Sequence, residues 1–356
     1  MSMRFKQALG ESACTCSPFS GNEGSCCNGT GKCEHWGESL ECGVGDLKDT
    51  PVCCNSDFSS KCCPADSACT QGCRDALLGS CDCIPLRPTE YDEEEALYSL
   101  VYVAASQCDA KKGLNDTWSC TACPKGYELR DVVVVDKSGH QALLGYDEAR
   151  DRIIVALRGT LSFMDVIDDV ENAVAVDYKE CDGCKVGAGW LDATTKLMGG
   201  IADALNELVG KWGEAEVWIS GHSLGAAMAP LVVKRLKVDE ADIYEKVRFP
   251  IYTFGQPRVG NDMYSDWAKD EFKKGWFRVV HHDDPIPHLP PPKLGFSHMS
   301  TEIWYAEKGT GKGFYEVCDG SGEDKQCSAG TLLSGEITDH LTYLDHDIVQ
   351  CHDSGF

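Results

Sequence analysis

The chain has 356 residues, and its 57 acidic and 33 basic side chains give a formal net charge of −24. Such an acidic protein is a poor partner for nucleic acid and for anionic membrane surfaces. The hydrophobic fraction of 42% is that of an ordinary globular protein. No apolar run approaches the length of a bilayer span, so we expect no transmembrane segment.

Cysteine is concentrated near the start of the chain. Fourteen of the 22 cysteines lie between Cys14 and Cys83, where large apolar residues are few. Because such a segment cannot bury much core, we expect a disulfide-rich module over residues 13–84 and an oxidising, extracellular location. Zinc binding is the alternative interpretation of these cysteines. Two sequons, at Asn28 and Asn115, fit a secreted glycoprotein.

The segments that flank this module carry weaker signals. Residues 1–12 do not form a signal peptide, because no apolar run follows the first residues. We expect them to be a disordered or added N-terminus, from which a native signal has been removed. Residues 85–92 contain two prolines and are expected to link the module to a second domain over residues 93–356.

The second domain alternates helix and strand patterns. Apolar residues at helical spacing predict a helix over residues 93–106. Further along the chain we expect strands at 132–135, 152–157 and 216–219, a helix at 226–237, and strands at 250–254 and 277–280. Strands that alternate with helices are typical of a mainly parallel sheet covered on both faces, so we expect an α/β fold.

A glycine-serine motif follows the strand at 216–219. Gly221-His222-Ser223-Leu224-Gly225 fits the G-x-S-x-G pattern, in which a sharp turn between a strand and a helix presents a nucleophilic serine. Side chains at positions 221 and 225 would collide across that turn, which explains the glycines. We therefore interpret Ser223 as a nucleophile, and an ordinary helix-capping serine is the alternative.

A serine nucleophile needs a base, and the base needs an acid that orients it. In this kind of fold the chain order is serine, acid, histidine. Asp283 and Asp284, just after the strand at 277–280, are both candidates for the acid. The candidates for the base are His288, His298, His340, His346 and His352. The residues alone do not choose among them.

Five motifs of the second domain follow one another along the chain. They are Leu157-Arg158-Gly159-Thr160, Gly221 to Ala226, Tyr252 to Gly260, Asp284 to Pro291 and Asp339 to Tyr343. With these motifs in this order, residues 93–351, nearly three quarters of the chain, resemble the class 3 (fungal-type) lipases of the α/β-hydrolase superfamily. The resemblance implies an α/β-hydrolase fold with flanking helices, and a reaction that needs no metal or organic cofactor.

The resemblance also implies roles for individual residues. It places the acid at Asp284 and the base at His340, and it makes His298 a structural histidine. The oxyanion hole falls on Thr160 and on the N–H of Leu224, two donors aimed at the charge that develops in the transition state. The implied disulfides are Cys108–Cys351, Cys120–Cys123 and Cys181–Cys184, and Cys318 and Cys327 are then left to pair.

Residues 161–178 lie where the family has a mobile helix, or lid, over the active site. Phe163, Val166, Ile167 and Val170 fall on one face of this helix. An amphipathic lid hides such a face when it is closed and offers it to lipid when it is open. A fixed surface helix is the alternative interpretation.

Taken with these residues, the resemblance implies a secreted serine ester hydrolase. Its expected substrates are acylglycerols, met at a lipid–water interface or in neutral lipid droplets, with phospholipids and galactolipids as near variants. A feruloyl or acetyl esterase on the same scaffold is one alternative. A binding protein that uses the cysteine-rich module is an alternative of another class.

Overall fold

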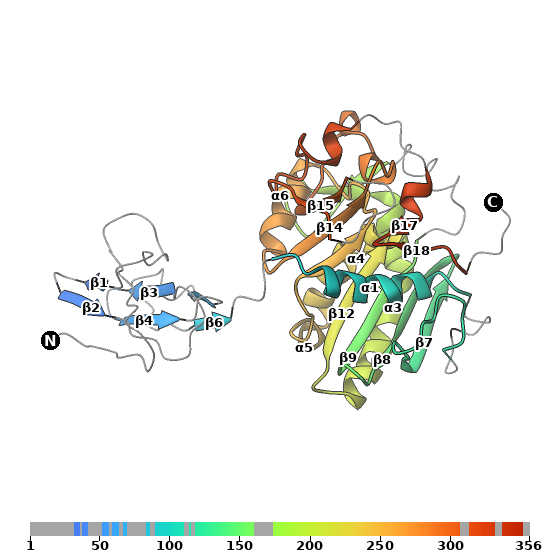
Figure 1. The fold of residues 1–356 in the computed structure, drawn as a ribbon, viewed down its shortest axis with the longest axis horizontal. Helices are drawn as coiled ribbons and strands as arrows, with labels where there is room; N and C mark the ends of the chain where they lie inside the picture. The colour runs from blue at the N-terminus through green and yellow to red at the C-terminus, as the bar shows by residue number, and fades with distance from the viewer. Residues whose placement is uncertain are drawn as a thin grey trace. The chain divides into compact units, whose positions relative to one another are not determined.

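The computed structural model describes residues 90–109, 114, 118–159, 174–306, 313–331 and 337–351, and the backbone of six short strands before them. The chain divides into two compact units, Met1–Thr89 and Glu90–Phe356 (Figure 1). The strands of the first unit form three antiparallel pairs: β1 (Lys32–His35) with β2 (Glu38–Glu41), β3 (Val52–Ser56) with β4 (Ser59–Cys63), and β5 (Ser67–Cys69) with β6 (Cys83–Pro85). The sequon asparagines Asn28 and Asn115 lie outside the described residues.

An eight-stranded sheet forms the centre of the second unit (Figure 1). Its spatial order is β16 (Glu316–Val317), β15 (Thr301–Tyr305), β14 (Trp276–His281), β13 (Ile251–Phe254), β12 (Glu216–His222), β9 (Arg152–Leu157), β8 (His140–Asp147) and β7 (Arg130–Lys137). The pairs from β15 to β9 are parallel, and the pairs at the two edges are antiparallel. The predicted α/β fold with a mainly parallel sheet is therefore confirmed.

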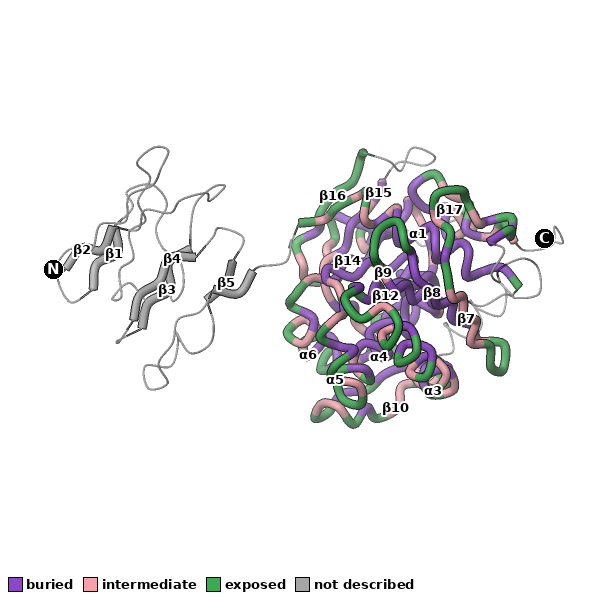
Figure 2. The backbone as a smooth tube through the Cα atoms, turned by 90° about the horizontal axis from the view of Figure 1, so that it is seen from below, coloured by how far each residue is buried: buried purple, intermediate pink, exposed green. Residues whose placement is uncertain are grey.

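Helices cover both faces of this sheet. The helices are α1 (Glu93–Ser106), α3 (Ala188–Lys211), α4 (Leu224–Asp239), α5 (Ala241–Tyr244) and α6 (Asp262–Glu271). Alternate residues of a strand point to opposite faces, and β12 shows this clearly. Val217 and Ile219 pack in the cluster that contains α3 and α4, whereas Trp218 packs in the cluster that contains α1. Burial is accordingly deepest along the central strands (Figure 2).

The predicted and observed elements agree best where local signals are strong. The helix predicted at 93–106 is α1, whose N-cap Asp92 accepts hydrogen bonds from the N–H groups of Glu94 and Glu95. The strand predicted at 152–157 is β9. The helix predicted at 226–237 extends over 224–239 as α4. Four observed elements have no counterpart among the predicted ones: α3, β8, β15 and α6.

Short strand pairs and 3-10 helices complete the second unit. They are the small antiparallel pairs β10 (Ala175–Asp177) with β11 (Lys185–Gly187) and β17 (Thr342–Tyr343) with β18 (His346–Asp347), and the 3-10 helices η2 (Ile286–His288), η3 (Pro292–Leu294), η4 (Ser328–Gly330) and η5 (Ile337–His340). No helix in the described part of the chain is long and apolar enough to cross a membrane.

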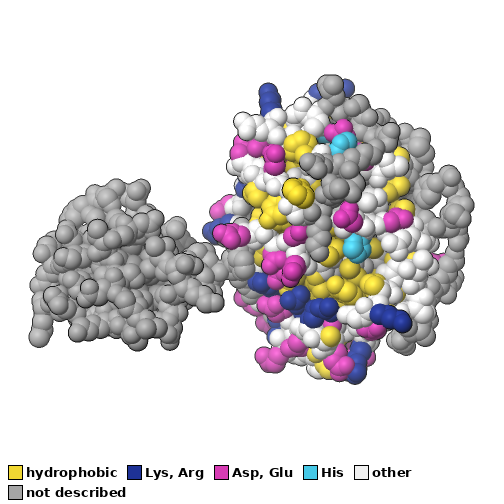
Figure 3. All heavy atoms as spheres, viewed as in Figure 1, with side chains coloured by type: hydrophobic (Ala, Val, Ile, Leu, Met, Phe, Trp, Pro, Cys, Tyr) yellow, Lys and Arg dark blue, Asp and Glu magenta, His cyan; other side chains and the backbone are white. Residues whose placement is uncertain are grey.

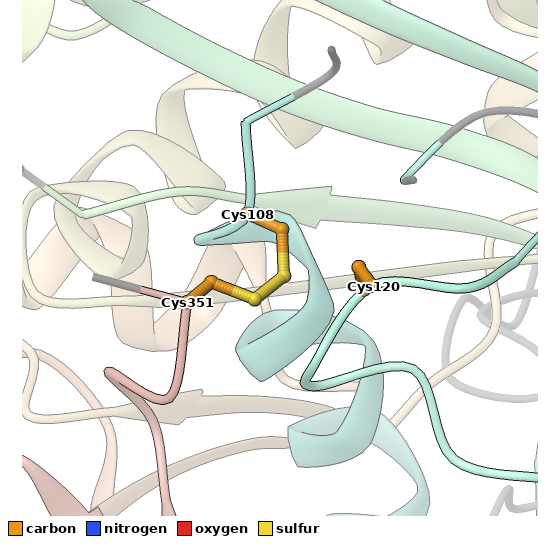
Figure 4. A group of neighbouring side chains, drawn as sticks. All are labelled: Cys108, Cys120 and Cys351. Carbon is orange, nitrogen blue, oxygen red and sulfur yellow. A yellow bond between two sulfur atoms is a disulfide. The ribbon is translucent and has the colours of Figure 1, made fainter. Parts of the chain in front are cut away.

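Four disulfides join described residues of the second unit: Cys108–Cys351, Cys120–Cys123, Cys181–Cys184 and Cys318–Cys327. Three of these are the pairs implied by the family resemblance, and the fourth joins the two cysteines that were left over. The sulfurs of Cys108, Cys120 and Cys351 lie within 4.8 Å of one another (Figure 4). Because each of these sulfurs is already in a disulfide, the group offers no thiolate to a metal ion.

Candidate active site

Ser223 occupies the sharp turn between β12 and α4. Its backbone has φ 56° and ψ −123°, a left-handed conformation that is strained for a residue with a side chain. The N–H of Ser223 donates to the carbonyl of Phe254 on β13 at 3.0 Å, which holds the turn against the neighbouring strand. The serine is 2% exposed, and its Oγ has no hydrogen-bond partner among the described residues. The turn thus presents a buried hydroxyl that is not committed to a structural contact.

Two glycines allow this turn to form. A Cβ at Gly221 would lie 2.4 Å from the carbonyl oxygen of Gly225, so a side chain would collide across the turn, as the sequence analysis expected. A Cβ at Gly225 would lie 2.1 Å from the carbonyl oxygen of Leu157 at the end of β9. The second glycine is therefore required by the adjacent strand rather than by the turn itself.

Asp284 and His340 are in direct contact. Asp284 follows β14 and is fully buried, and His340 ends η5 and is 1% exposed. The Nδ1 of His340 donates to Oδ2 of Asp284 at 2.7 Å. This contact fixes the tautomer in which Nε2 carries the lone pair that a general base needs.

Two further donors satisfy the buried carboxylate. The hydroxyl of Tyr343 donates to the same Oδ2 of Asp284, and the N–H of Ile286 donates to Oδ1 at 2.8 Å. Burial by itself raises the pKa of Asp284, but the charge of His340 and the three hydrogen bonds outweigh it and lower that pKa. Asp284 is therefore held as a carboxylate, the form that orients and stabilises an imidazolium.

The segment around His340 contacts residues close in sequence to Ser223 and to Asp284. The Nε2 of His222, the residue just before Ser223, donates to the carbonyl of His340 at 2.9 Å, and the two rings lie 4.3 Å apart between centroids. The Nδ1 of His282 lies 2.9 Å from Oδ2 of Asp339. Because His282 stands two residues before Asp284, this pair links the segment of the acid to that of the base.

The other candidates for the acid and base are engaged elsewhere. The side chain of Asp283 is 30% exposed and lies 3.8 Å from Nδ1 of His282. The Nε2 of His298 donates to the carbonyl of Pro287 at 2.6 Å. Burial, followed by the charges of Arg278 and Arg258, holds the pKa of His298 well below its usual range. The remaining candidates lie as follows: His288 is the last residue of η2, His346 contacts the carbonyl of Leu344, and His352 is outside the described residues.

Only part of the expected oxyanion hole falls on described residues. Leu224 is the first residue of α4, so its N–H lies at a helix N-terminus, where the helix dipole favours negative charge. Thr160 lies outside the described residues. The residue before it, Gly159, is described, and a Cβ there would lie 3.1 Å from the Cβ of Ser223. The chain therefore passes the nucleophile just before Thr160.

The predicted lid residues Phe163, Val166, Ile167 and Val170 also lie outside the described residues. Sequence reasoning assigned no role to Tyr343, although this residue stands at the end of the motif that contains His340. It also assigned none to His282 or Asp339. These three residues carry no recognisable spacing signal, and only the folded chain brings them to Asp284 and His340.

The second unit is similar to known proteins in both sequence and structure. The model of the family Lipase (class 3) matches residues 154–294. The chain is 30% identical over 268 residues to secreted mono- and diacylglycerol lipase 1 of Fusarium solani, which covers 72% of this chain and 77% of that protein. The crystal structure of a lipase from Rhizopus microsporus var. chinensis matches with a TM-score of 0.65 and 28% identity, over 74% of this chain and 91% of that one. A triacylglycerol lipase whose catalytic centre is a serine protease triad matches with a TM-score of 0.64 and 26% identity, over 74% of this chain and 98% of that one.

Proposed function

Since this chain belongs to the class 3 lipases and is a carboxylic ester hydrolase, we propose that it cleaves acylglycerol esters with Ser223, Asp284 and His340 as its catalytic triad. The observation that carries the assignment of residues is the buried contact between Asp284 and His340. The ring of His340 also packs against that of His222, the residue just before the strained Ser223 at the turn between β12 and α4. No other described pair of carboxylate and histidine combines full burial with this position.

The proposed reaction begins with acyl transfer to the enzyme. Oγ of Ser223 attacks the ester carbonyl carbon while Nε2 of His340 takes the hydroxyl proton. Asp284 stabilises the imidazolium that forms. The N–H of Leu224 and the backbone and hydroxyl of Thr160 donate to the oxyanion, and each such donor contributes about 3 kcal/mol to the transition state.

The second half of the cycle releases both products. His340 gives its proton to the departing alcohol as the bond between carbonyl carbon and alkoxy oxygen breaks. Water then attacks the acyl-enzyme, with His340 again accepting a proton, and the fatty acid leaves as Ser223 regains its hydrogen. Every step uses groups of this chain and water.

We further propose that the enzyme is secreted and acts at a lipid–water interface. The Fusarium relative is named as a secreted lipase of mono- and diacylglycerols. The four disulfides between described residues fit an oxidising compartment. Acidic side chains are spread over the face of the second unit that Figure 3 shows, and the net charge of the chain is −24, so a neutral lipid is a better partner than an anionic one.

Replacing the nucleophile tests this proposal. We expect Ser223→Ala to lower turnover of emulsified tributyrin and of soluble p-nitrophenyl butyrate by about 10⁴-fold or more, with an unchanged melting temperature. Ser138→Ala, in an exposed turn after β7, is the matched control and should retain full activity. Normal turnover by Ser223→Ala would overturn the triad. A wild-type enzyme that cleaves feruloyl or acetyl esters but no acylglycerol would overturn the substrate class.

The same substrates test the lid. Rate should be measured against tributyrin concentration through its solubility limit. We expect a jump in rate when droplets form, because an interface favours the open lid. A smooth saturation curve across that limit would contradict a lid that opens on lipid.

A further inference from the structure

Glu323 lies in the loop that the Cys318–Cys327 disulfide closes, away from the triad. Its carboxylate binds Arg258 through two hydrogen bonds, from Nε to Oε1 at 2.7 Å and from Nη2 to Oε2 at 2.6 Å. Oε1 also accepts the backbone N–H of His298 at 3.0 Å. The Arg258 side chain is 5% exposed, so this is a two-pronged ion pair with one nearly buried partner.

Arg258 and His298 together hold the segment that follows the catalytic acid. Nη1 of Arg258 donates to the carbonyls of His288 and Pro290, and its backbone N–H donates to the carbonyl of Leu289 at 2.9 Å. Nε2 of His298 donates to the carbonyl of Pro287. Four consecutive carbonyls, from 287 to 290, therefore accept hydrogen bonds from two residues that Glu323 itself contacts.

The backbone of the disulfide loop is shaped for this approach. Gly322 has φ +90°, and a Cβ there would lie 2.6 Å from the carbonyl oxygen of His298. Nη2 of Arg278 donates to the carbonyl of Gly322 at 3.3 Å. The base of the loop is fixed to β15, because the N–H of Cys318 donates to the carbonyl of Glu302 at 3.0 Å. These contacts place the disulfide loop against His298 and β15, where Glu323 meets Arg258.

The charges of the network agree with its geometry. Burial raises the pKa of Glu323, but the hydrogen bonds and charge of Arg258 outweigh it and lower that pKa, so Glu323 is a carboxylate at neutral pH. The pKa of His298 is held low, so its ring is neutral and Nε2 carries the hydrogen that the carbonyl of Pro287 accepts. Each group is therefore in the ionisation state that its contacts require.

We propose that Glu323 is a positioning residue for Asp284. Through Arg258 and His298, the disulfide-closed loop 318–327 sets residues 287–290 and thereby the carboxylate that orients His340. Neither Glu323 nor Arg258 touches the reacting atoms in this arrangement. The inference rests on the proposed triad and adds to it a group that acts from outside the site.

The first test compares two glutamates of the same part of the chain. Glu323→Gln leaves Arg258 without a charged partner, so residues 287–290 should shift. We expect kcat on soluble p-nitrophenyl butyrate to fall about tenfold to a hundredfold with KM nearly unchanged, because small misplacements of catalytic groups cost this much. Glu316→Gln, on the exposed edge strand β16, is the matched control and should keep wild-type kcat. Wild-type kcat in a folded Glu323→Gln protein would overturn the inference.

A second variant allows the inference to be tested even if Glu323→Gln does not fold. Glu323→Asp keeps the charge but shortens the side chain, so it should recover part of the lost kcat and keep the melting temperature near that of the wild type. If Glu323→Gln does not fold, a wild-type kcat in Glu323→Asp overturns the inference, and a severalfold lower kcat supports it.

A double substitution separates positioning from general stability. In Asp284→Asn the carboxylate that Glu323 is proposed to place is already gone. We therefore expect Glu323→Gln to cause no further loss of kcat in that background, since linked residues are not additive. A full multiplicative loss would show that Glu323 acts independently of Asp284. Failure of the triad itself would instead be seen in an active Ser223→Ala, so the two proposals fail in different measurements.

Discussion

The nucleophile and its acid–base partners are positioned in different ways. Ser223 is held by main-chain packing, because the glycines at 221 and 225 let the turn fit closely against itself and against β9, and a main-chain hydrogen bond joins it to β13. Asp284 follows β14 and His340 ends η5, and their relative position depends on side-chain hydrogen bonds, among them the one from Tyr343 to Asp284. Main-chain packing of this kind is sterically rigid. A side-chain network is assembled from across the chain and can be altered one hydrogen bond at a time.

This difference predicts that the largest effects follow from changes at the turn around Ser223. In Gly225→Ala the new methyl group would lie 2.1 Å from the carbonyl oxygen of Leu157, and no flexible side chain can yield there. We expect loss of activity and a free energy of unfolding lower by about 3 kcal/mol or more, as for other overpacked buried sites. Urea unfolding and ester turnover measure the two effects.

A second glycine provides the control for that prediction. Gly199 is exposed on α3, and a Cβ there meets nothing within 4 Å. Gly199→Ala should leave activity intact and stabilise the helix by up to about 1 kcal/mol. Normal stability in Gly225→Ala would mean that the turn can accommodate a methyl group. It would contradict the difference between a rigid turn at Ser223 and an adjustable side-chain network around Asp284.

The same contrast explains how far sequence could be used for prediction. The turn at Ser223 is encoded in five consecutive residues, so its place between β12 and α4 could be predicted from the motif. Asp283 and Asp284 are neighbours of the same residue type, and only the approach of a segment 56 residues further along distinguishes them. The family resemblance named Asp284 and His340, but it implied nothing about Tyr343 or Glu323, whose contacts exist only in the folded chain.

The missed helix α3 has a comparable physical cause. Its N-cap is Gly187, which makes no side-chain capping hydrogen bond, and its first turn has no acidic residue. The usual signals of a helix start are therefore missing, and glycines within the helix lower its intrinsic propensity. Tertiary packing compensates, because one face of α3 is buried through residues such as Trp190, Leu197 and Ile201. The fold class could be predicted without this helix, but the layer it forms could not.

On the acid–base side, removal of one hydrogen bond should have an intermediate effect. Tyr343→Phe deletes a donor to Oδ2 of Asp284, the oxygen that also accepts from His340. Hydrogen bonds to charged groups contribute about 1.5–3 kcal/mol, so we expect kcat to fall about tenfold to a hundredfold with little change in KM. Steady-state kinetics on a soluble ester measure this.

Tyr264 is the matched control for that exchange. It is fully buried, and its hydroxyl has no hydrogen-bond partner in the part of the chain that the structure describes. Tyr264→Phe should therefore leave kcat unchanged and keep or slightly raise stability. Equal kinetics for the two variants would show that the hydroxyl of Tyr343 does not contribute to the function of Asp284.

The smallest effect should be on the pH dependence of stability, and it too belongs to the acid–base side. The main-chain contacts of the turn do not titrate, whereas His298 is buried in the network that holds residues 287–290, and its pKa is well below the ordinary value. The unfolded chain binds a proton at this histidine below about pH 6.5, and the folded chain does not, so stability falls as pH decreases. This residue should contribute a slope of up to ~1.4 kcal/mol per pH unit between pH 6.5 and its folded pKa.

His298→Gln keeps a donor for the carbonyl of Pro287 but cannot titrate, so its unfolding free energy, measured in urea between pH 7 and 5, should fall less steeply. Identical slopes in the wild-type and His298→Gln proteins would mean that His298 takes up a proton in the folded state, and the neutral donor that the network requires would have to be abandoned.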